Sequence, residues 1–182
     1  GSVKVAQHLG ENYFYDYIKK FGFGQKTGVA LPGEAVGQFK ELAAWDERSL
    51  ASISFGHEIS ATPLQMINAV SAIANGGTLM VPRVTRAIIK NGRVTKRFKS
   101  KSVRRVISTQ TSRQVIEILK HAVKNGTGGK AAIKGYEVAG KTGTAQKYDH
   151  KKGSYSSTAY VSSFVGFVPA DAAKIAILVM VD

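Results

Sequence analysis

Five consecutive residues combine side chains that can bind a carboxylate. Lys141-Thr142-Gly143-Thr144-Ala145 offers an ammonium, two hydroxyls and a glycine that has no side chain. The letters around it, YEVAGKTGTAQK, predict a strand. On a strand, these groups could bind a substrate carboxylate while the glycine lets the ligand approach the backbone closely. The triplet Lys-Thr-Gly is too short to indicate a function by itself.

The last third of the chain predicts the sheet that would hold this motif. Three runs, at residues 136–147, 159–170 and 174–182, have the composition of strands. A polar loop at 149–156 and a turn at 169–173 connect them, and such short connections favour antiparallel pairing. Almost all of residues 175–181 is apolar, which predicts a central strand covered on both faces.

Three helices are expected before residue 75. Apolar residues recur at helical spacing over residues 3–20, with a break at Gly10, and therefore predict two short helices. A glycine-rich loop, FGFGQKTGVALPGE, follows. Thr62-Pro63-Leu64-Gln65 has the pattern of a capping box with proline at the first helical position. The helix after it should bury one stripe, formed by Leu64, Ile67, Val70, Ile73 and Ala74.

A hairpin and a further helix are expected between residues 83 and 126. Two runs rich in β-branched residues flank Asn91-Gly92, the dipeptide best suited to a two-residue type I′ turn. The next helix should start near Thr111, with Gln114 as its capping partner, and end at Asn125. Its expected buried face comprises Val115, Ile118, Leu119 and Ala122.

The composition fits one domain with a strongly basic surface. Among 182 residues, 26 are Lys or Arg and 12 are Asp or Glu, which gives a net charge of +14. The basic run at residues 90–105 could bind nucleic acid, but it has no interleaved aromatic residues beyond Phe98, so we favour a solvated face and expect no nucleic-acid partner.

The chain has no cysteine, which leaves its redox compartment open. It also has no apolar run of roughly 18 residues and no signal pattern, so any membrane anchor is expected outside it.

The remaining candidates predict no further chemistry. The chain has four histidines, His8, His57, His121 and His150, and their spacing is not that of metal ligands. We therefore expect no metal and no cofactor. General-base roles are disfavoured for the same four residues. An aromatic cluster has helical spacing and is expected to pack in the core or at a domain contact; it comprises Tyr13, Phe14, Tyr15 and Tyr17.

Four ordered blocks of the chain resemble the class B penicillin-binding proteins. They are FGFGQKTGVALPGE, SFGHEISATPLQ, GKAAIKGYEVAGKTGTAQK and SSFVGFVPA. The resemblance covers nearly the whole chain and is strongest at residues 131–146, where it is to the division-specific transpeptidases. It implies the α/β (α+β type) fold shared by penicillin-binding transpeptidases and serine β-lactamases, an antiparallel sheet flanked by helices. Residues 1–182 would be an incomplete, C-terminal portion of one such domain.

The resemblance also implies an activity and a site. Members cross-link peptidoglycan stem peptides through a serine acyl-enzyme, and β-lactams inhibit them. Lys141 would support the positive field of the cleft, Thr142 and Thr144 would bind the terminal carboxylate, and the Thr144 N–H would be an oxyanion donor. Gly143 would leave room for the ligand. Implied partners are stem peptides, β-lactams and cell-division or other cell-wall synthesis proteins, at the extracytoplasmic side of the bacterial inner membrane.

The sequence departs from the family pattern at the nucleophile. No serine has a lysine three positions later, and no Ser-x-Asn occurs. We therefore expect the chain to begin just after the Ser-x-Asn motif and to be inactive alone. Two alternatives stay open: a β-lactamase or β-lactam sensor domain, and a non-catalytic module whose basic surface binds anionic polymers or nucleic acid.

Overall fold

The computed structural model describes residues 1–149 and 151–182. Its α-helices are α1 (Ser2–Leu9), α2 (Glu11–Lys20), α3 (Ser49–Ser54), α4 (Pro63–Ala74) and α5 (Thr109–Lys124). Three 3₁₀ turns are η1 (Leu42–Ala44), η2 (Gly129–Ala131) and η3 (Ala170–Ala172). The short strands are β1 (Gln38–Phe39), β2 (Ile59–Ser60), β3 (Thr78–Met80), β4 (Ala87–Lys90), β5 (Arg93–Arg97) and β6 (Ser102–Arg105). The long strands are β7 (Ala139–Asp149), β8 (Ser154–Val168) and β9 (Ile175–Val181).

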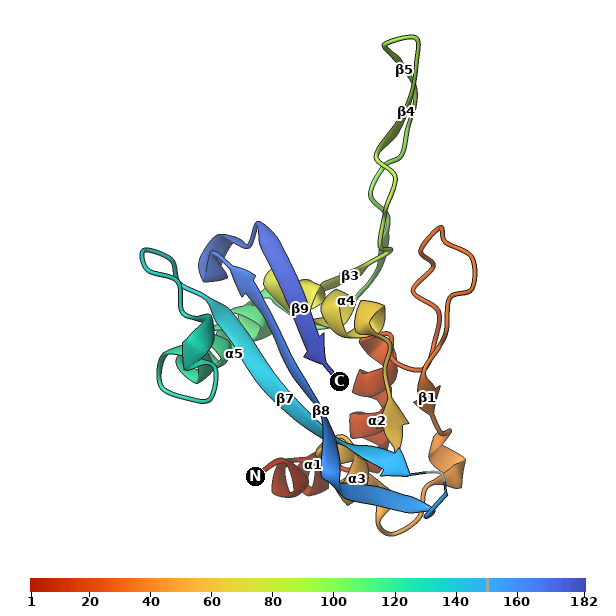
Figure 1. Ribbon diagram of the computed structural model, residues 1–182, viewed down its shortest axis with the longest axis vertical. Helices are drawn as coiled ribbons and strands as arrows, with labels where there is room; N and C mark the ends of the chain where they lie inside the picture. The colour runs from red at the N-terminus through yellow and green to blue at the C-terminus, as the bar shows by residue number, and fades with distance from the viewer. Residues whose placement is uncertain (150) are drawn as a thin grey trace.

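The three long strands form one antiparallel sheet in the order β7-β8-β9, with α4 and α5 against one face (Figure 1). Both the strands and their antiparallel pairing are as the sequence predicted. The connection between β7 and β8 is shorter than the predicted loop, because β7 continues to Asp149 and β8 begins at Ser154. His150, within that loop, lies outside the described residues.

The prediction for β9 was wrong, because this strand lies at an edge of the sheet. Ala176 packs toward the helices, whereas Ile175, Ile177 and Val179 on the other face are each more than half exposed. An apolar run shows that a strand can be buried on both faces, but it does not show whether both faces are covered.

Two hydrophobic clusters hold the helices to the rest of the fold. One consists of Ala72, Leu79, Val106 and Ile107. The other consists of Ile116, Ala139, Phe167 and Ala170. Ile73 of α4 packs against both clusters, so this helix connects the N-terminal helices to the sheet.

The starts of the predicted helices agree with the sequence except at α5, and α3 was not predicted. Gly10, at φ 80°, separates α1 from α2 as predicted. The capping box of α4 is present, since Thr62 and Gln65 exchange side-chain and backbone hydrogen bonds. Helix α5 begins earlier than predicted, because the Ser108 hydroxyl accepts from the Thr111 N–H at 2.9 Å and caps the helix.

The buried face of α5 also differs from the predicted one. Ile116 and Val123 are buried and Leu119 is partly buried, whereas Ile118 is 67% exposed. The polar residue Ser112 lies on the buried face because its hydroxyl donates to the Ile73 carbonyl at 2.6 Å. A hydrogen bond of this kind removes the penalty for burying the hydroxyl.

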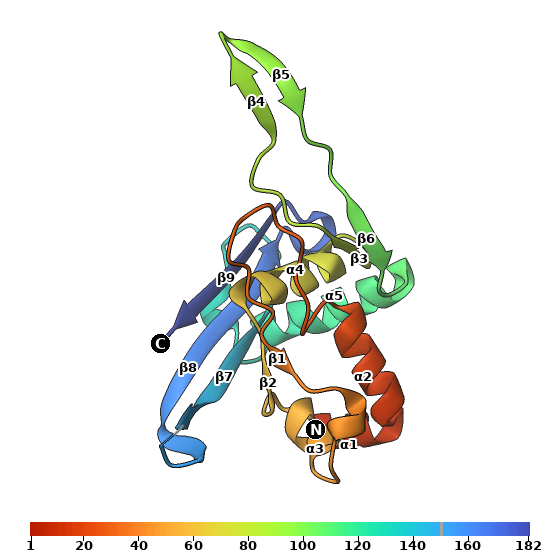
Figure 2. The same ribbon diagram turned by 90° about the vertical axis from the view of Figure 1, so that its right-hand side faces the viewer.

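The predicted hairpin is present as β4 and β5. Asn91 and Gly92 both have positive φ, at 49° and 73°, as a type I′ turn requires. The hairpin stands away from the rest of the molecule (Figures 1 and 2). Within the described part of the chain, no helix has the length and apolar character needed to span a bilayer.

Candidate functional site

Strand β7 places the Lys-Thr-Gly motif at the edge of the sheet opposite β9. Its pairing with β8 sets Lys141 beside Val165 and Thr144 beside Ser162. No strand among the described residues pairs with its outer edge. Because side chains alternate along a strand, Thr142 and Thr144 start on one face and Lys141 on the other, but the long Lys141 side chain bends back to contact Thr142. An edge strand of this kind can bind an extended ligand through its backbone.

Two glycines of β7 lie close to β8. A Cβ atom on Gly140 would lie 2.5 Å from Phe164 Cζ and 2.8 Å from the Val165 carbonyl oxygen. A Cβ on Gly143 would lie 2.7 Å from Ser163 Oγ. All three distances are shorter than real contacts. Backbone atoms of β8 are among those near Gly140, so packing inside the sheet is a reason for glycine there, whereas the Ser163 hydroxyl near Gly143 can rotate away.

Two polar side chains contact the Thr142 hydroxyl. The Lys141 ammonium donates to the Thr142 carbonyl at 3.0 Å and to the Thr142 hydroxyl at 3.3 Å. The same hydroxyl lies 2.6 Å from the Thr127 hydroxyl. Lys141 and Thr144 are exposed and Thr142 is half-buried. Within residues 1–149 and 151–182, no carboxylate forms an ion pair with Lys141, so its ammonium can meet an anionic ligand.

Sequence reasoning missed Thr127, whose hydroxyl contacts that of Thr142. Thr127 follows α5 in a glycine-rich turn and is 15 positions from Thr142. Only the packing of α5 against β7 brings the two hydroxyls together. A threonine between glycines was the only available signal, and by itself it does not indicate a contact.

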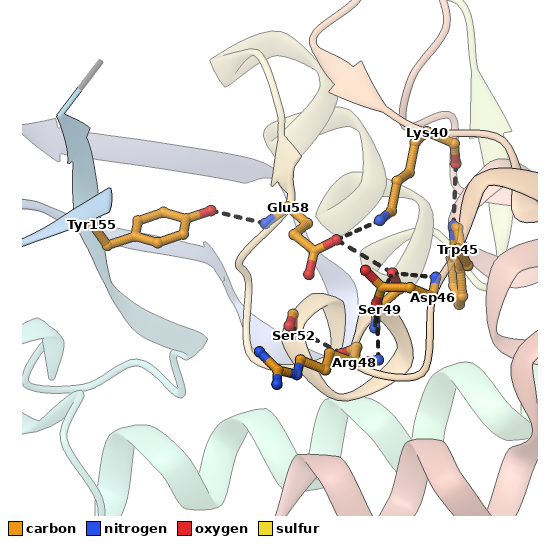
Figure 3. A network of polar contacts seen from close by, with 8 residues as sticks. All are labelled: Lys40, Trp45, Asp46, Arg48, Ser49, Ser52, Glu58 and Tyr155. Atoms are coloured by element: carbon orange, nitrogen blue, oxygen red, sulfur yellow. Dashed lines mark hydrogen bonds and ion pairs between the residues drawn. The ribbon is translucent and has the colours of Figure 1, made fainter. Parts of the chain in front are cut away.

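A polar network holds the far end of the β7–β8 hairpin (Figure 3). The Tyr155 hydroxyl accepts from the Glu58 N–H at 2.9 Å, and the Tyr155 ring stacks on His57 with centroids 3.8 Å apart. The Glu58 carboxylate pairs with Lys40 at 2.6 Å and accepts from the Ser49 hydroxyl at 3.4 Å. The sequence assigned His57 no catalytic role, and the structure places it in this contact.

Glu58 should make the stability of the fold sensitive to acid. The hydrogen bond from Lys40 is the main reason that the pKa of Glu58 is lowered. A carboxylate with a lowered folded-state pKa stabilises the fold above its unfolded pKa of about 4.3, and this contribution is lost as pH falls through the folded-state value. We therefore expect Glu58→Gln to be less stable than wild type at pH 7 and to lose less stability as pH falls below about 5, where an unfolded glutamate begins to bind protons.

Urea unfolding followed by circular dichroism at each pH tests this. Glu47→Gln is the matched control, since Glu47 is exposed and has no ion pair among the described residues. If both variants lose stability in acid as wild type does, Glu58 has no special part in the acid response.

The aromatic cluster of α2 packs as the sequence predicted for Tyr15. Its ring stacks on Phe39 with centroids 5.2 Å apart and meets the edge of Trp45 at 5.8 Å. Tyr13 is 52% exposed and contacts Tyr17 instead. Among the described residues, no cluster of three or more His, Cys, Asp or Glu side chains could hold a metal ion.

Comparisons with known proteins place the whole chain in one family. The sequence-family model described as the penicillin-binding protein transpeptidase domain matches residues 1–182. The chain is 42% identical to stage V sporulation protein D of Bacillus subtilis, and the match covers 100% of the chain and 28% of that protein. It is 36% identical to penicillin-binding protein PbpB of Mycobacterium tuberculosis, of which it also covers 28%. The chain thus spans less than a third of the length of these relatives.

Solved structures of penicillin-binding proteins have the same fold. The crystal structure of penicillin-binding protein 3 from Mycobacterium tuberculosis complexed with aztreonam matches with a TM-score of 0.92 and 35% identity, over 100% of this chain and 42% of that one. The transpeptidase domain of Burkholderia pseudomallei penicillin-binding protein 3 matches with a TM-score of 0.86 and 30% identity, over 100% of this chain and 52% of that one. These matches favour a transpeptidase over the β-lactamase or sensor alternative. The chain belongs to the penicillin-binding protein transpeptidase domain family.

Proposed function

We propose that this chain supplies the Lys-Thr-Gly side of the active site of a peptidoglycan D,D-transpeptidase. The observation that carries the proposal is the position of Lys141-Thr142-Gly143 on the open edge of β7, with an ammonium and a hydroxyl in contact and no carboxylate paired with the ammonium among the described residues. Such a group suits the terminal carboxylate of a stem peptide. β-Lactams carry an anionic group, a carboxylate or a sulfonate, beside the reactive ring, and one relative, penicillin-binding protein 3 of Mycobacterium tuberculosis, is solved with ampicillin and with aztreonam.

Each residue has a separate part in the proposed reaction. The Lys141 ammonium contributes positive charge beside the ligand, and the hydroxyls of Thr142 and Thr144 bind its carboxylate. The Thr144 N–H is one of two donors to the oxyanion that forms when the serine attacks the carbonyl. Gly143 leaves the strand edge open to the ligand. The Ser-x-x-Lys and Ser-x-Asn segments supply the nucleophilic serine, its lysine base and the second oxyanion donor. Neither pattern occurs in the 182 residues.

The proposed setting is cell-wall synthesis on the extracytoplasmic side of the bacterial inner membrane, where the peptidoglycan substrate is found. The similarity to stage V sporulation protein D and to division-type transpeptidases supports a role in division or in a related shape-forming process. Partners among the division proteins are part of the same proposal. On this proposal, penicillin does not acylate the 182-residue chain by itself.

Intact-mass spectrometry after incubation with a reactive penicillin tests the proposed function. Two samples are compared: the 182-residue chain, and a protein that joins it to the Ser-x-x-Lys and Ser-x-Asn segments of the family. We expect one penicilloyl adduct per joined protein, absent when that protein is heat-denatured first, and no stoichiometric adduct on the chain alone. A joined protein that is folded and takes no adduct would contradict the proposed function. An adduct on the chain alone would show that one of its own serines is the nucleophile.

A further inference from the structure

The β4–β5 hairpin is a free-standing ribbon. Its two strands pair only with each other among the described residues, so β4 and β5 each have an outer edge with no strand partner. In both views it extends away from the helices and from the β7–β9 sheet (Figures 1 and 2). A two-stranded hairpin is marginally stable by itself, and packing against a third element usually supplies the rest of its stability.

The hairpin and its stems concentrate positive charge. Residues 83–101 contain eight Lys or Arg residues and no Asp or Glu: Arg83, Arg86, Lys90, Arg93, Lys96, Arg97, Lys99 and Lys101. None of the ion pairs found among the described residues involves these eight side chains. Because like charges repel across paired strands, the open edges disfavour a second copy of the hairpin and favour a strand that carries carboxylates.

Apolar side chains lie among these charges and have no core to join. Ile88 is 47% exposed, Ile89 is 66% exposed and Val94 is 43% exposed. Ile89 and Val94 lie opposite each other in the hairpin. A polyanion that binds through charge alone would leave these residues in water, whereas a polypeptide strand beside β5 with apolar residues at alternate positions would cover Val94.

We propose that the β4–β5 hairpin is a docking site for an acidic, extended segment of a partner protein, which adds to the outer edge of β5 as a third strand. Strand β5 reads Arg93-Val94-Thr95-Lys96-Arg97, so a basic side chain lies on each of its faces. Carboxylates on one face of the added strand would pair with Arg93 and Arg97, its apolar residues on the other face would cover Val94, and its backbone would satisfy the open edge. Nucleic acid fits less well, because Phe98 is the one aromatic residue of residues 83–101 and Lys96 already covers its ring at 5.0 Å.

The experiment is a titration of the purified chain, labelled for amide NMR, with a synthetic peptide of about ten alternating glutamate and valine residues, the length of an ordinary strand. We expect shifts and slower hydrogen exchange at the amides of residues 93–97, and affinity that falls as salt rises. A second peptide has proline in place of each valine, so it keeps the charge but cannot pair as a strand. It should bind at least about tenfold more weakly.

Matched variants locate the site on the chain. Arg93→Glu, Lys96→Glu and Arg97→Glu together should weaken binding of the glutamate–valine peptide at least about tenfold. Lys4→Glu, Arg113→Glu and Lys174→Glu make the same change in net charge at exposed positions outside the hairpin and should leave the affinity within about twofold of wild type. The proposal would be overturned if the proline peptide bound as tightly as the glutamate–valine peptide, or if the two triple variants lost the same affinity. Either result would show that the basic surface binds anions without a defined site. The absence of binding to wild type at millimolar peptide would also overturn the proposal.

Discussion

Replacing Gln65 with methionine should lower the free energy of unfolding by roughly 3 kcal/mol, because two part-buried carbonyls would each lose a hydrogen-bond donor worth about 1–3 kcal/mol. Gln65 is 1% exposed, and its Nε2 donates to the carbonyls of Gln25 and Val36 at 2.8 Å each. Its Oε1 accepts from the Thr62 N–H at 2.9 Å. Methionine has a similar length, so the loss should come from hydrogen bonding and not from a cavity.

Gln110→Met is the matched control, since Gln110 is exposed near the start of α5. Urea unfolding followed by circular dichroism should show a change within about 0.5 kcal/mol for this variant. A loss for Gln65→Met as small as that of the control would mean that the two carbonyls find other donors, and that Gln65 does not hold the glycine-rich loop to α4.

Thr142→Val should reduce the second-order rate of acylation by penicillin about 10- to 100-fold, the effect of losing one hydrogen bond to a charged ligand group. This prediction rests on the proposed function and uses the protein that joins the chain to the family's nucleophile segments. Valine has nearly the same shape as threonine and cannot donate to a carboxylate. Thr127→Val should cause a smaller loss, because it removes the partner of Thr142 and keeps the Thr142 hydroxyl.

The control is Thr158→Val, the same chemical change at an exposed position of β8. Its acylation rate should match wild type, and the thermal midpoints of all three variants should be compared so that unfolding is not mistaken for a loss of binding. Equal acylation rates for Thr142→Val and Thr158→Val would exclude the Thr142 hydroxyl from ligand binding.

Features set by local rules were predictable from the sequence. Gly10 separates two helices, Thr62 and Gln65 form a capping box, and Asn91-Gly92 forms the turn, because each depends on residues only a few positions apart. The three antiparallel strands followed from short connections. The position of Lys141-Thr142-Gly143 on a strand of this sheet was predictable in the same way; its role in ligand binding stays a prediction.

Features set by distant contacts were not predictable. Ser112 is buried because it meets the carbonyl of Ile73, 39 positions earlier, and this contact turns α5 away from the face that its apolar residues indicated. The exposure of Ile177 in β9 depends on which strands lie beside it and on where α4 and α5 pack. The contact between Thr127 and Thr142 likewise requires that α5 and β7 already be packed together.

Helix α4 couples the unfolding of the two hydrophobic clusters. Ile73 contributes its side chain to both hydrophobic clusters and its carbonyl to the Ser112 hydroxyl. Opening one cluster would therefore remove packing from the other at the same residue. Independent local unfolding requires regions with few contacts between them, and a shared residue at the boundary removes that independence. The N-terminal helices and the strand that carries Lys141 are thus energetically coupled through a single turn of helix, although they lie far apart in the sequence.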